Sequence, residues 1–187
     1  MTPRVRRSLG NDTAQHVEVL GRGVGGNRVP DLLKRLDRDV LYLRPSLVVV
    51  YIGINDVWHF SLNGNGTSRK EYKQGLGELI QRILASGSRV LLCTPTVIGE
   101  KDDGMNPQDS LLNQYANVSR SVARELEINL CDLHETFRAY LSSHNPDNRG
   151  SGILTRDGVH LSEAGNSLVA KAIIGCLKNM NPSQKPR

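Results

Sequence analysis

The sequence predicts an α/β fold in which helices cover both faces of a parallel sheet. Short apolar runs rich in β-branched residues alternate along the chain with stretches in which apolar residues recur at helical spacing. Such alternation favours parallel strands joined by right-handed helical crossovers. The clearest strand is 47–52, which lies between Pro45 and Gly53 and is apolar enough to be buried on both faces.

The length and composition fit one domain. We expect residues 1–187 to form a single domain with enough core to fold without disulfides or a structural metal. The three cysteines lie in apolar segments and are interpreted as buried hydrophobic residues. The net charge of +5 is spread over several predicted helices and only 4% of residues are aromatic, which argues against a nucleic-acid partner. No apolar run reaches about 18 residues, so no membrane span is expected.

The first elements surround a glycine-rich turn. Residues 5–9 are interpreted as the last turns of a helix, and 16–20 alternates like a short strand. The turn at 21–27 leads to a helix that opens near Pro30, where proline suits a first helical turn, and that stops before Pro45. Its apolar face is Leu32, Leu33, Leu36, Val40 and Leu43.

The central strand is followed by a predicted loop, a helix and a second strand. The loop, 58–67, is rich in glycine and asparagine. The helix begins with a capping-box pattern at 68–71 and ends at Gly87. The strand at 89–94 is closed by Pro95. The inner face of the helix is Tyr72, Leu76, Leu79, Ile80 and Ile83.

The last third of the chain adds three helices and one strand. We expect a helix capped by Asp109, a strand at 128–133, a short helix at 136–141 and a final helix at 162–178 that starts from a serine cap. Residues 179–187 are expected to form a disordered tail. The inward faces of the two longer helices are Leu111, Leu112, Tyr115, Val118, Val122 and Leu126, and Leu168, Val169, Ala172, Ile173 and Cys176.

Two polar residues follow the central strand directly. Asn55 and Asp56 stand where ligands bind in open α/β sheets, just beyond the carboxyl ends of the strands. An amide at that point can donate a hydrogen bond to a developing negative charge. The same stretch, 53–56, also suits a simple turn. We expect Asp56 and Trp58 to help bind a substrate, with a purely structural role for Trp58 as the alternative.

A carboxylate and an imidazole stand close together before the final helix. Asp157 and His160 are three residues apart, and a carboxylate that accepts a proton from one imidazole nitrogen leaves the other free to take a proton from a nucleophile. The same spacing also occurs by chance in exposed turns. The glycine turn, Asn55 and this pair would nevertheless meet at one edge of a doubly wound sheet. This convergence favours a catalytic site.

The glycines allow a competing hypothesis. Gly21, Gly23 and Gly26 match the G-x-G-x-x-G spacing of a dinucleotide-binding turn. In that motif the helix starts within the glycines and an acidic residue ends the next strand, whereas here the helix opens near Pro30 and the acidic candidates fall inside a helix. Dinucleotide binding is therefore disfavoured, and no cofactor is expected.

No metal site is predicted either. Cys131 and His134 have a spacing that could suit two metal ligands, but a lone pair is insufficient. Three histidines lack polar neighbours of the kind found beside His160, and we expect them on the surface or in loops: His59, His134 and His144.

Three motifs together resemble a known family. Gly26 within 22–27, the run 53–56 and the run 157–162 look like the second, third and fifth blocks of the SGNH hydrolases, also called GDSL-type esterases and lipases. The resemblance covers roughly residues 5–177. It implies a flavodoxin-like three-layer α/β/α sandwich with a five-stranded parallel sheet, and cofactor-free hydrolysis of carboxylic esters or thioesters.

The resemblance also implies roles for individual residues. His160 would be the general base and Asp157 its orienting partner, while the Gly26 amide and the Asn55 side chain would donate hydrogen bonds to the oxyanion. The partner would be a small ester or thioester. Family members act on lysophospholipids, acyl thioesters, simple esters and acetylated sugars, and the sequence does not choose among them.

One departure from the family pattern concerns the nucleophile. The family's first block is a strand that ends in Gly-Asp-Ser and should precede residues 16–20, and we expect the chain to start too late to contain it. Ser8 follows two arginines with no apolar strand before it, and Ser46 precedes a strand, so neither is assigned as the nucleophile. In the family the missing strand lies between 16–20 and 47–52, and its loss would leave unpaired backbone groups in the sheet.

Two explanations of this departure stand. Either a longer reading frame encodes a complete serine esterase, or the chain is a natural truncation that acts as a catalytically inactive binding domain. For the polypeptide as written we expect little or no esterase activity, because loss of the nucleophile removes most of the rate enhancement. The chain as written would be cytoplasmic, and a protein with an upstream signal peptide would be secreted.

Overall fold

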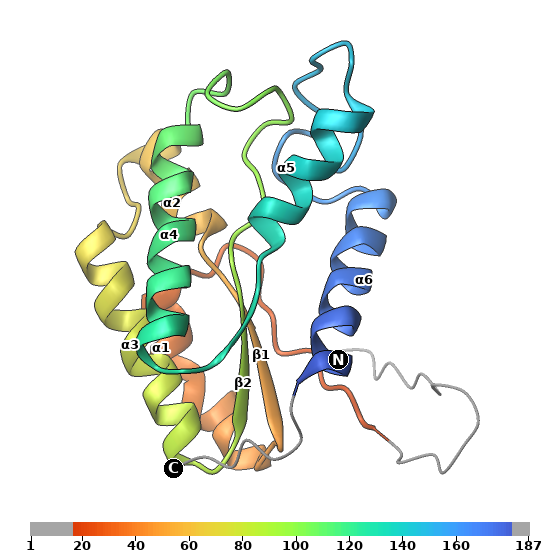
Figure 1. The fold of residues 1–187 in the computed structure, drawn as a ribbon. Helices are drawn as coiled ribbons and strands as arrows, with labels where there is room; N and C mark the ends of the chain where they lie inside the picture. Colours follow the sequence, from red (N-terminus) through yellow and green to blue (C-terminus); the bar gives the residue numbers. More distant parts are fainter. Residues whose placement is uncertain (1–16, 181–187) are drawn as a thin grey trace.

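The computed structural model of the chain describes residues 17–180 (Figure 1). Its sheet has three parallel strands in the order β1-β2-β3, namely β1 (Leu47–Tyr51), β2 (Arg89–Cys93) and β3 (Asn129–Cys131). In this register Tyr51 pairs with Cys93, and Cys93 pairs with Cys131. The three strands agree with the predicted strands at 47–52, 89–94 and 128–133, each somewhat shorter than expected.

Within residues 17–180, six α-helices connect and cover these strands. They are α1 (Val29–Asp39), α2 (Ile54–Asn63), α3 (Arg69–Ala85), α4 (Asp109–Glu125), α5 (Leu133–His144) and α6 (Glu163–Asn179), and a short 3-10 helix, Leu41–Leu43, follows α1. None of the helices between residues 17 and 180 is long and apolar enough to cross a bilayer.

The sheet is the middle of three layers. Side chains alternate between the two faces of a strand, so Val50 and Leu92 face the main core that α1, α3 and α4 complete. Leu91 and Cys131 face the opposite side, where they pack against α6. Figure 1 shows α1, α3 and α4 on one side of the strands and α6 on the other. This is the three-layer α/β/α arrangement that the sequence predicts.

Helix α3 forms as its sequence predicts. The Ser68 hydroxyl accepts a hydrogen bond from the Glu71 amide at 3.3 Å, and the Glu71 carboxylate accepts one from the Ser68 amide at 3.0 Å. This capping box satisfies amides that the first helical turn leaves free. All five residues of the predicted inner face are buried: Tyr72, Leu76, Leu79, Ile80 and Ile83.

The predicted loop at 58–67 is wrong in its first part, because α2 extends to Asn63. The residues of α2 have low helix propensity, so packing decides the conformation: Val57 is fully buried in the main core. The helix ends where Gly64 adopts a left-handed conformation with φ +71°. Helix α5 is likewise longer than the short helix expected at 136–141.

The predicted strand at 16–20 does not form a strand within the described residues. Val19 makes one isolated bridge, and the side chains of Val17 and Val19 are 64% and 62% exposed. A strand satisfies its backbone groups only beside a partner, and the sheet described over 17–180 contains none next to this segment.

Both ends of the chain carry expectations that lie outside the described residues. These are the helix end at 5–9 and most of the expected tail, 181–187. The first two residues of the expected tail 179–187, Asn179 and Met180, are described and do not fit the expectation of disorder. Asn179 is the last residue of α6, and Met180 is buried in the cluster beneath this helix.

One edge of β1 is open. Within residues 17–180, β1 pairs with β2 alone. Val49 and Tyr51 point to the α6 side of this edge strand and remain 39% and 37% exposed, although their neighbours Val50 and Ile52 are buried. The open edge lies where the family resemblance implies a further strand.

Candidate active site

The glycine turn and the start of α2 are joined by a hydrogen bond. Gly26 has φ +79°, a conformation that favours glycine, in a turn where the Asn27 amide donates to the Val24 carbonyl at 3.3 Å. Asn55 lies in the first turn of α2, and its Nδ2 donates to the Asn27 carbonyl at 3.1 Å. Because Nδ2 carries two protons, the second can serve a ligand beside this turn.

Gly53 makes the tight connection that puts Asn55 at the edge of the sheet. It precedes α2 with φ +124°, a conformation that side chains other than glycine rarely adopt. A Cβ at this position would lie 2.8 Å from the Tyr72 hydroxyl. Backbone conformation and packing therefore both require glycine here.

Asp157 and His160 form a hydrogen-bonded pair. The Asp157 Oδ2 lies 2.7 Å from His160 Nδ1, and its Oδ1 accepts the amides of His160 at 2.8 Å and Val159 at 3.0 Å. These bonds, chiefly the one from the His160 amide, hold the pKa of Asp157 at about 2. A carboxylate on Nδ1 fixes the proton there and leaves Nε2 as the basic nitrogen.

Trp58 connects this pair to α2. The Trp58 and His160 rings meet edge to face, with centroids 5.6 Å apart and planes at 82°. Trp58 follows Asn55 by three residues in the same helix, and side chains at that spacing share a helix face. The structure therefore brings His160, Trp58, Asn55 and the glycine turn to the same edge of the sheet, the edge at which β1 and β2 end.

Asp56 is placed differently from the prediction. Its side chain is fully buried, and its Oδ1 accepts the Val29 amide at 3.1 Å. This bond ties the first turn of α2 to the first residue of α1, so we correct its role from substrate contact to internal support. Burial raises the pKa of Asp56, while the nearby Thr67 hydroxyl and the Val29 amide oppose this shift.

Two substitutions test this internal role. Replacing Asp56 with asparagine is expected to keep the free energy of unfolding at pH 7 within about 1 kcal/mol, because asparagine still offers an acceptor to Val29 and removes a buried charge. Replacing it with alanine should lose about 1–3 kcal/mol, because the Val29 amide is left without its partner. Urea denaturation measures both, and equal loss in both variants would contradict the assignment.

The same residue should make stability depend on pH. A carboxyl pKa raised above the unfolded value of about 3.9 means that the folded state holds this proton more tightly. The contribution of Asp56 is therefore present below the unfolded pKa and is lost as the pH rises through the folded pKa. The asparagine variant should lack this part of the loss when the two denaturation curves are compared between about pH 4 and 7.

His134 is not on the surface, in contrast to the expectation. It is 2% exposed, with Nδ1 at 2.5 Å from the Thr96 carbonyl and Nε2 at 2.6 Å from Asn113 Oδ1. Burial lowers the pKa of His134. Among residues 17–180 no group of three or more histidine, cysteine, aspartate or glutamate side chains is placed to hold a metal ion.

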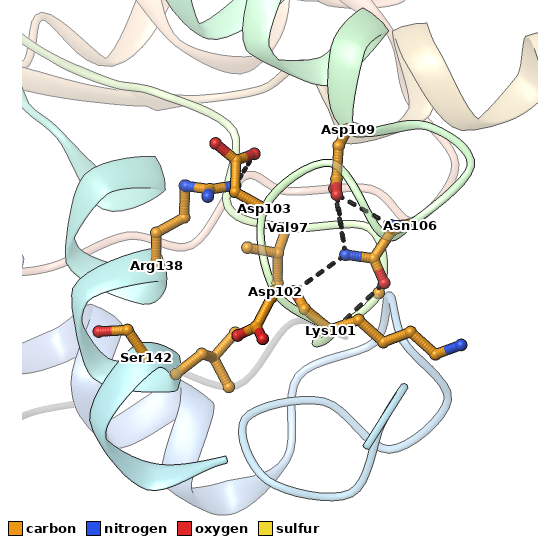
Figure 2. A pocket seen from close by; sticks show the side chains of 10 residues that line it. Val97, Lys101, Asp102, Asp103, Asn106, Asp109, Arg138 and Ser142 are labelled. Carbon is orange, nitrogen blue, oxygen red and sulfur yellow. Dashed lines mark hydrogen bonds and ion pairs between the residues drawn. The ribbon is translucent and has the colours of Figure 1, made fainter. Parts of the chain in front are cut away.

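A small cavity lies apart from these residues. Figure 2 shows it between the loop that follows β2 and helix α5, where Asp103 and Arg138 form an ion pair of 2.6 Å at its wall. Its volume of about 40 Å³ suits only a few water molecules. None of the predicted site residues lines it, so it is not assigned to the substrate.

The structure does not support the dinucleotide hypothesis. Helix α1 begins at Val29, after the glycines, and no strand leads into them within the described residues. Of the acidic residues in α1, Asp37 pairs with Arg82 and Asp39 pairs with Arg35. These carboxylates lie inside a helix and pair with arginines, whereas the ribose-binding acid of that motif stands at the end of a strand.

The fold is that of a three-layer α/β/α protein whose polar residues gather at the carboxyl edge of a parallel sheet. The chain belongs to the GDSL-like lipase/acylhydrolase family, whose model matches residues 1–168. This membership agrees with the resemblance carried by the three motifs.

The relatives include acetylxylan esterases. An acetylxylan esterase of Geobacillus stearothermophilus is 29% identical over 163 residues, which are 84% of this chain and 71% of that protein. The crystal structure of the acetyl xylan esterase AlAXEase has a TM-score of 0.83 and 42% identity, covering 84% of this chain and 79% of that one. The crystal structure of Axe2 from G. stearothermophilus has a TM-score of 0.77 and 27% identity, covering 88% of this chain and 73% of that one.

Proposed function

We propose that this chain forms the base and oxyanion site of a serine esterase that removes acetyl groups from xylo-oligosaccharides. The observation that carries the proposal is the Asp157–His160 pair, in which His160 Nδ1 lies 2.7 Å from Asp157 Oδ2 and the ring packs against Trp58. Within residues 17–180 no hydrogen bond occupies His160 Nε2. A histidine oriented in this way can take the proton of a serine hydroxyl as that oxygen attacks the ester carbonyl.

The oxyanion is assigned to the turn on the other side of the site. The second proton of Asn55 Nδ2 and the Gly26 amide would donate to the carbonyl oxygen as it becomes negative. The Asn27 carbonyl holds the Asn55 amide in place. The entropic cost of orienting this donor is therefore met before a substrate binds.

The substrate class comes from the relatives. Several solved relatives are acetylxylan esterases, and three catalytic mutants of Axe2 replace a serine, an aspartate and a histidine. The aspartate and the histidine are three positions apart. Asp157 and His160 have the same spacing. Simple acyl esters, thioesters and lysophospholipids, which the wider family also uses, are the alternatives.

We propose that the nucleophilic serine is supplied by sequence upstream of residue 1 in a longer reading frame, on a strand that pairs with the open edge of β1. The exposure of Val49 and Tyr51 at that edge supports this place. Ser46 lies before β1, at the opposite end of the strand from Asn55, and Ser8 is outside the described residues.

A binding domain without turnover is the second candidate. It is favoured by one observation, that the structure records no hydrogen bond from a serine of residues 17–180 to His160 Nε2. Such a domain would hold an acetylated sugar at the same edge of the sheet and leave the ester intact.

The experiment compares two polypeptides. The 187-residue chain and the product of the extended frame are assayed with p-nitrophenyl acetate and with acetylated xylo-oligosaccharides. We expect hydrolysis only by the extended product, and its loss when the serine of the upstream Gly-Asp-Ser motif is replaced by alanine, whereas Ser46→Ala keeps full activity. Upstream codons without an apolar strand and this motif, or an inactive extended product, would leave only the binding domain.

A further inference from the structure

Glu100 is a buried carboxylate bonded to three consecutive residues of another loop. The residue is only 1% exposed. Oε1 accepts the Leu154 amide at 2.7 Å and the Thr155 hydroxyl at 2.7 Å, and it also accepts the Thr155 amide. Oε2 accepts the Ile153 amide at 2.9 Å. One carboxylate thus satisfies the backbone of the segment that leads into Asp157.

The Thr155 hydroxyl connects Glu100 to the turn at 157–160. It donates to Glu100 and accepts the Gly158 amide at 3.1 Å. The Gly158 carbonyl in turn accepts the Gly99 amide at 2.7 Å, so the residue before Glu100 holds the same turn. The turn is closed by the Arg156 amide, which donates to the His160 carbonyl at 2.8 Å.

The loop that carries Glu100 is itself fixed. The Glu100 amide donates to the Gly150 carbonyl at 3.0 Å, and the Glu100 carbonyl accepts the Asn145 side chain at 2.7 Å. Figure 2 shows the next part of the loop, where Asn106 Nδ2 bonds the Lys101 carbonyl at 3.1 Å and the Asp109 carboxylate at 3.0 Å. Glu100 is therefore anchored on a cross-bonded loop.

The carboxylate of Glu100 is compensated by hydrogen bonds and not by a cation. No lysine, arginine or histidine among residues 17–180 forms an ion pair with it, so hydrogen-bond donors alone compensate the buried charge. Bonds to an ionised acceptor are about twice as strong as bonds between neutral groups. A buried carboxylate without its donors would be costly. Segment 153–155 is thereby held to one arrangement.

We propose that Glu100 is a positioning residue that acts through Thr155 and Gly158 to hold Asp157 against His160 Nδ1. The inference rests on the proposed function, since it assigns the loop contact to the base of that reaction. Sequence reasoning gave no sign of it, because Glu100 lies in a loop more than 50 residues before its partners.

Two variants separate the steps of this chain of contacts. Glu100→Gln keeps the size of the side chain but turns an amide donor toward a backbone N–H, most directly that of Ile153. Thr155→Val keeps the shape of a fully buried side chain and removes the hydroxyl that the Gly158 amide uses. Glu135→Gln is the matched control, because this glutamate is exposed in the first turn of α5.

The first measurement needs no nucleophile. In the 187-residue chain, ¹⁵N chemical shifts of the imidazole rings give the ratio of the Nδ1–H to the Nε2–H tautomer of His160. We expect this ratio to fall about tenfold in Glu100→Gln and in Thr155→Val, the effect of losing one ordinary hydrogen bond. It should stay unchanged in Glu135→Gln. A general loss of stability would not alter the tautomer of one histidine in the folded protein.

The second measurement uses the extended product. We expect kcat to fall by a factor of about 10–100 in both variants with little change in KM, because a displaced base affects the transition state more than substrate binding. If Glu100→Gln does not fold, as judged by near-ultraviolet circular dichroism, Thr155→Val decides alone.

The outcomes distinguish this inference from the proposed function. A folded variant with the native tautomer ratio overturns the role of Glu100, even if the extended product is an active esterase. A lowered ratio in an extended product that hydrolyses no ester supports the positioning role and overturns the proposed function instead.

Discussion

Replacing His160 with alanine in the extended product is expected to lower kcat for p-nitrophenyl acetate by a factor of about 10⁴ or more. The His160 imidazole is the base proposed for this site, and without it the serine hydroxyl keeps its proton. The remaining oxyanion donors should leave a small rate above that of water. Initial rates with purified protein measure the effect.

The control for this prediction is His144→Ala. His144 is exposed at the end of α5, where its Nδ1 bonds the Tyr140 carbonyl at 2.8 Å. Its removal should leave kcat within about a factor of two, because it touches none of the site residues. Comparable losses in the two variants would mean that His160 acts through stability and not as a base.

Replacing Asp157 with asparagine is expected to lower kcat by a factor of at least about 100 at pH 7. The asparagine Oδ1 can keep the amides of Val159 and His160, which then turns its Nδ2 toward His160 Nδ1. A donor at that position favours the Nε2–H tautomer, in which the nitrogen facing the substrate already carries a proton. Asp157 is about half exposed, so the purely electrostatic part of the loss should be smaller than at a buried pair.

The pH dependence gives a second check on Asp157. Its folded pKa of about 2 lies below the usual unfolded value of about 3.9. The bond to His160 therefore contributes to stability above the unfolded pKa and is lost only as the pH falls through about 2. Protonation of Asp157 should therefore make no contribution to any change of activity between about pH 4 and 7.

The control for the second prediction is Asp147→Asn. Asp147 is exposed in the polar loop before the site, and its replacement should change kcat by less than about a factor of two. A rate for Asp157→Asn within the same limit would remove the carboxylate from the mechanism.

Local pattern was sufficient for the elements whose stability is local. The capping box before α3 and its five buried residues follow from the spacing of polar and apolar residues, which needs no knowledge of the rest of the chain. The pair Asp157 and His160 also comes from spacing, because both residues lie in one turn.

The local sequence pattern was insufficient where contacts with distant segments determine the conformation. Most residues of helix α2 have low helix propensity, and the helix forms because Val57 is buried in the main core and Asp56 bonds the Val29 amide. The strand expected at 16–20 has the right alternation, but it has no partner strand in the described sheet. His134 looks like a loop residue in the sequence, whereas the Thr96 carbonyl and the Asn113 side chain enclose it.

The sequence by itself determined the α/β class and the family motifs, and it supplied the residue proposed as the base, because these depend on residue types at short spacing. Only the tertiary structure decided which polar groups meet. It placed Asn55 on the Asn27 carbonyl, bonded the buried Asp56 to the Val29 amide and set Glu100 against 153–155. The reason is that hydrogen bonds between loops depend on how the packed strands and helices bring distant segments together. The spacing of residues along the chain does not predict these contacts.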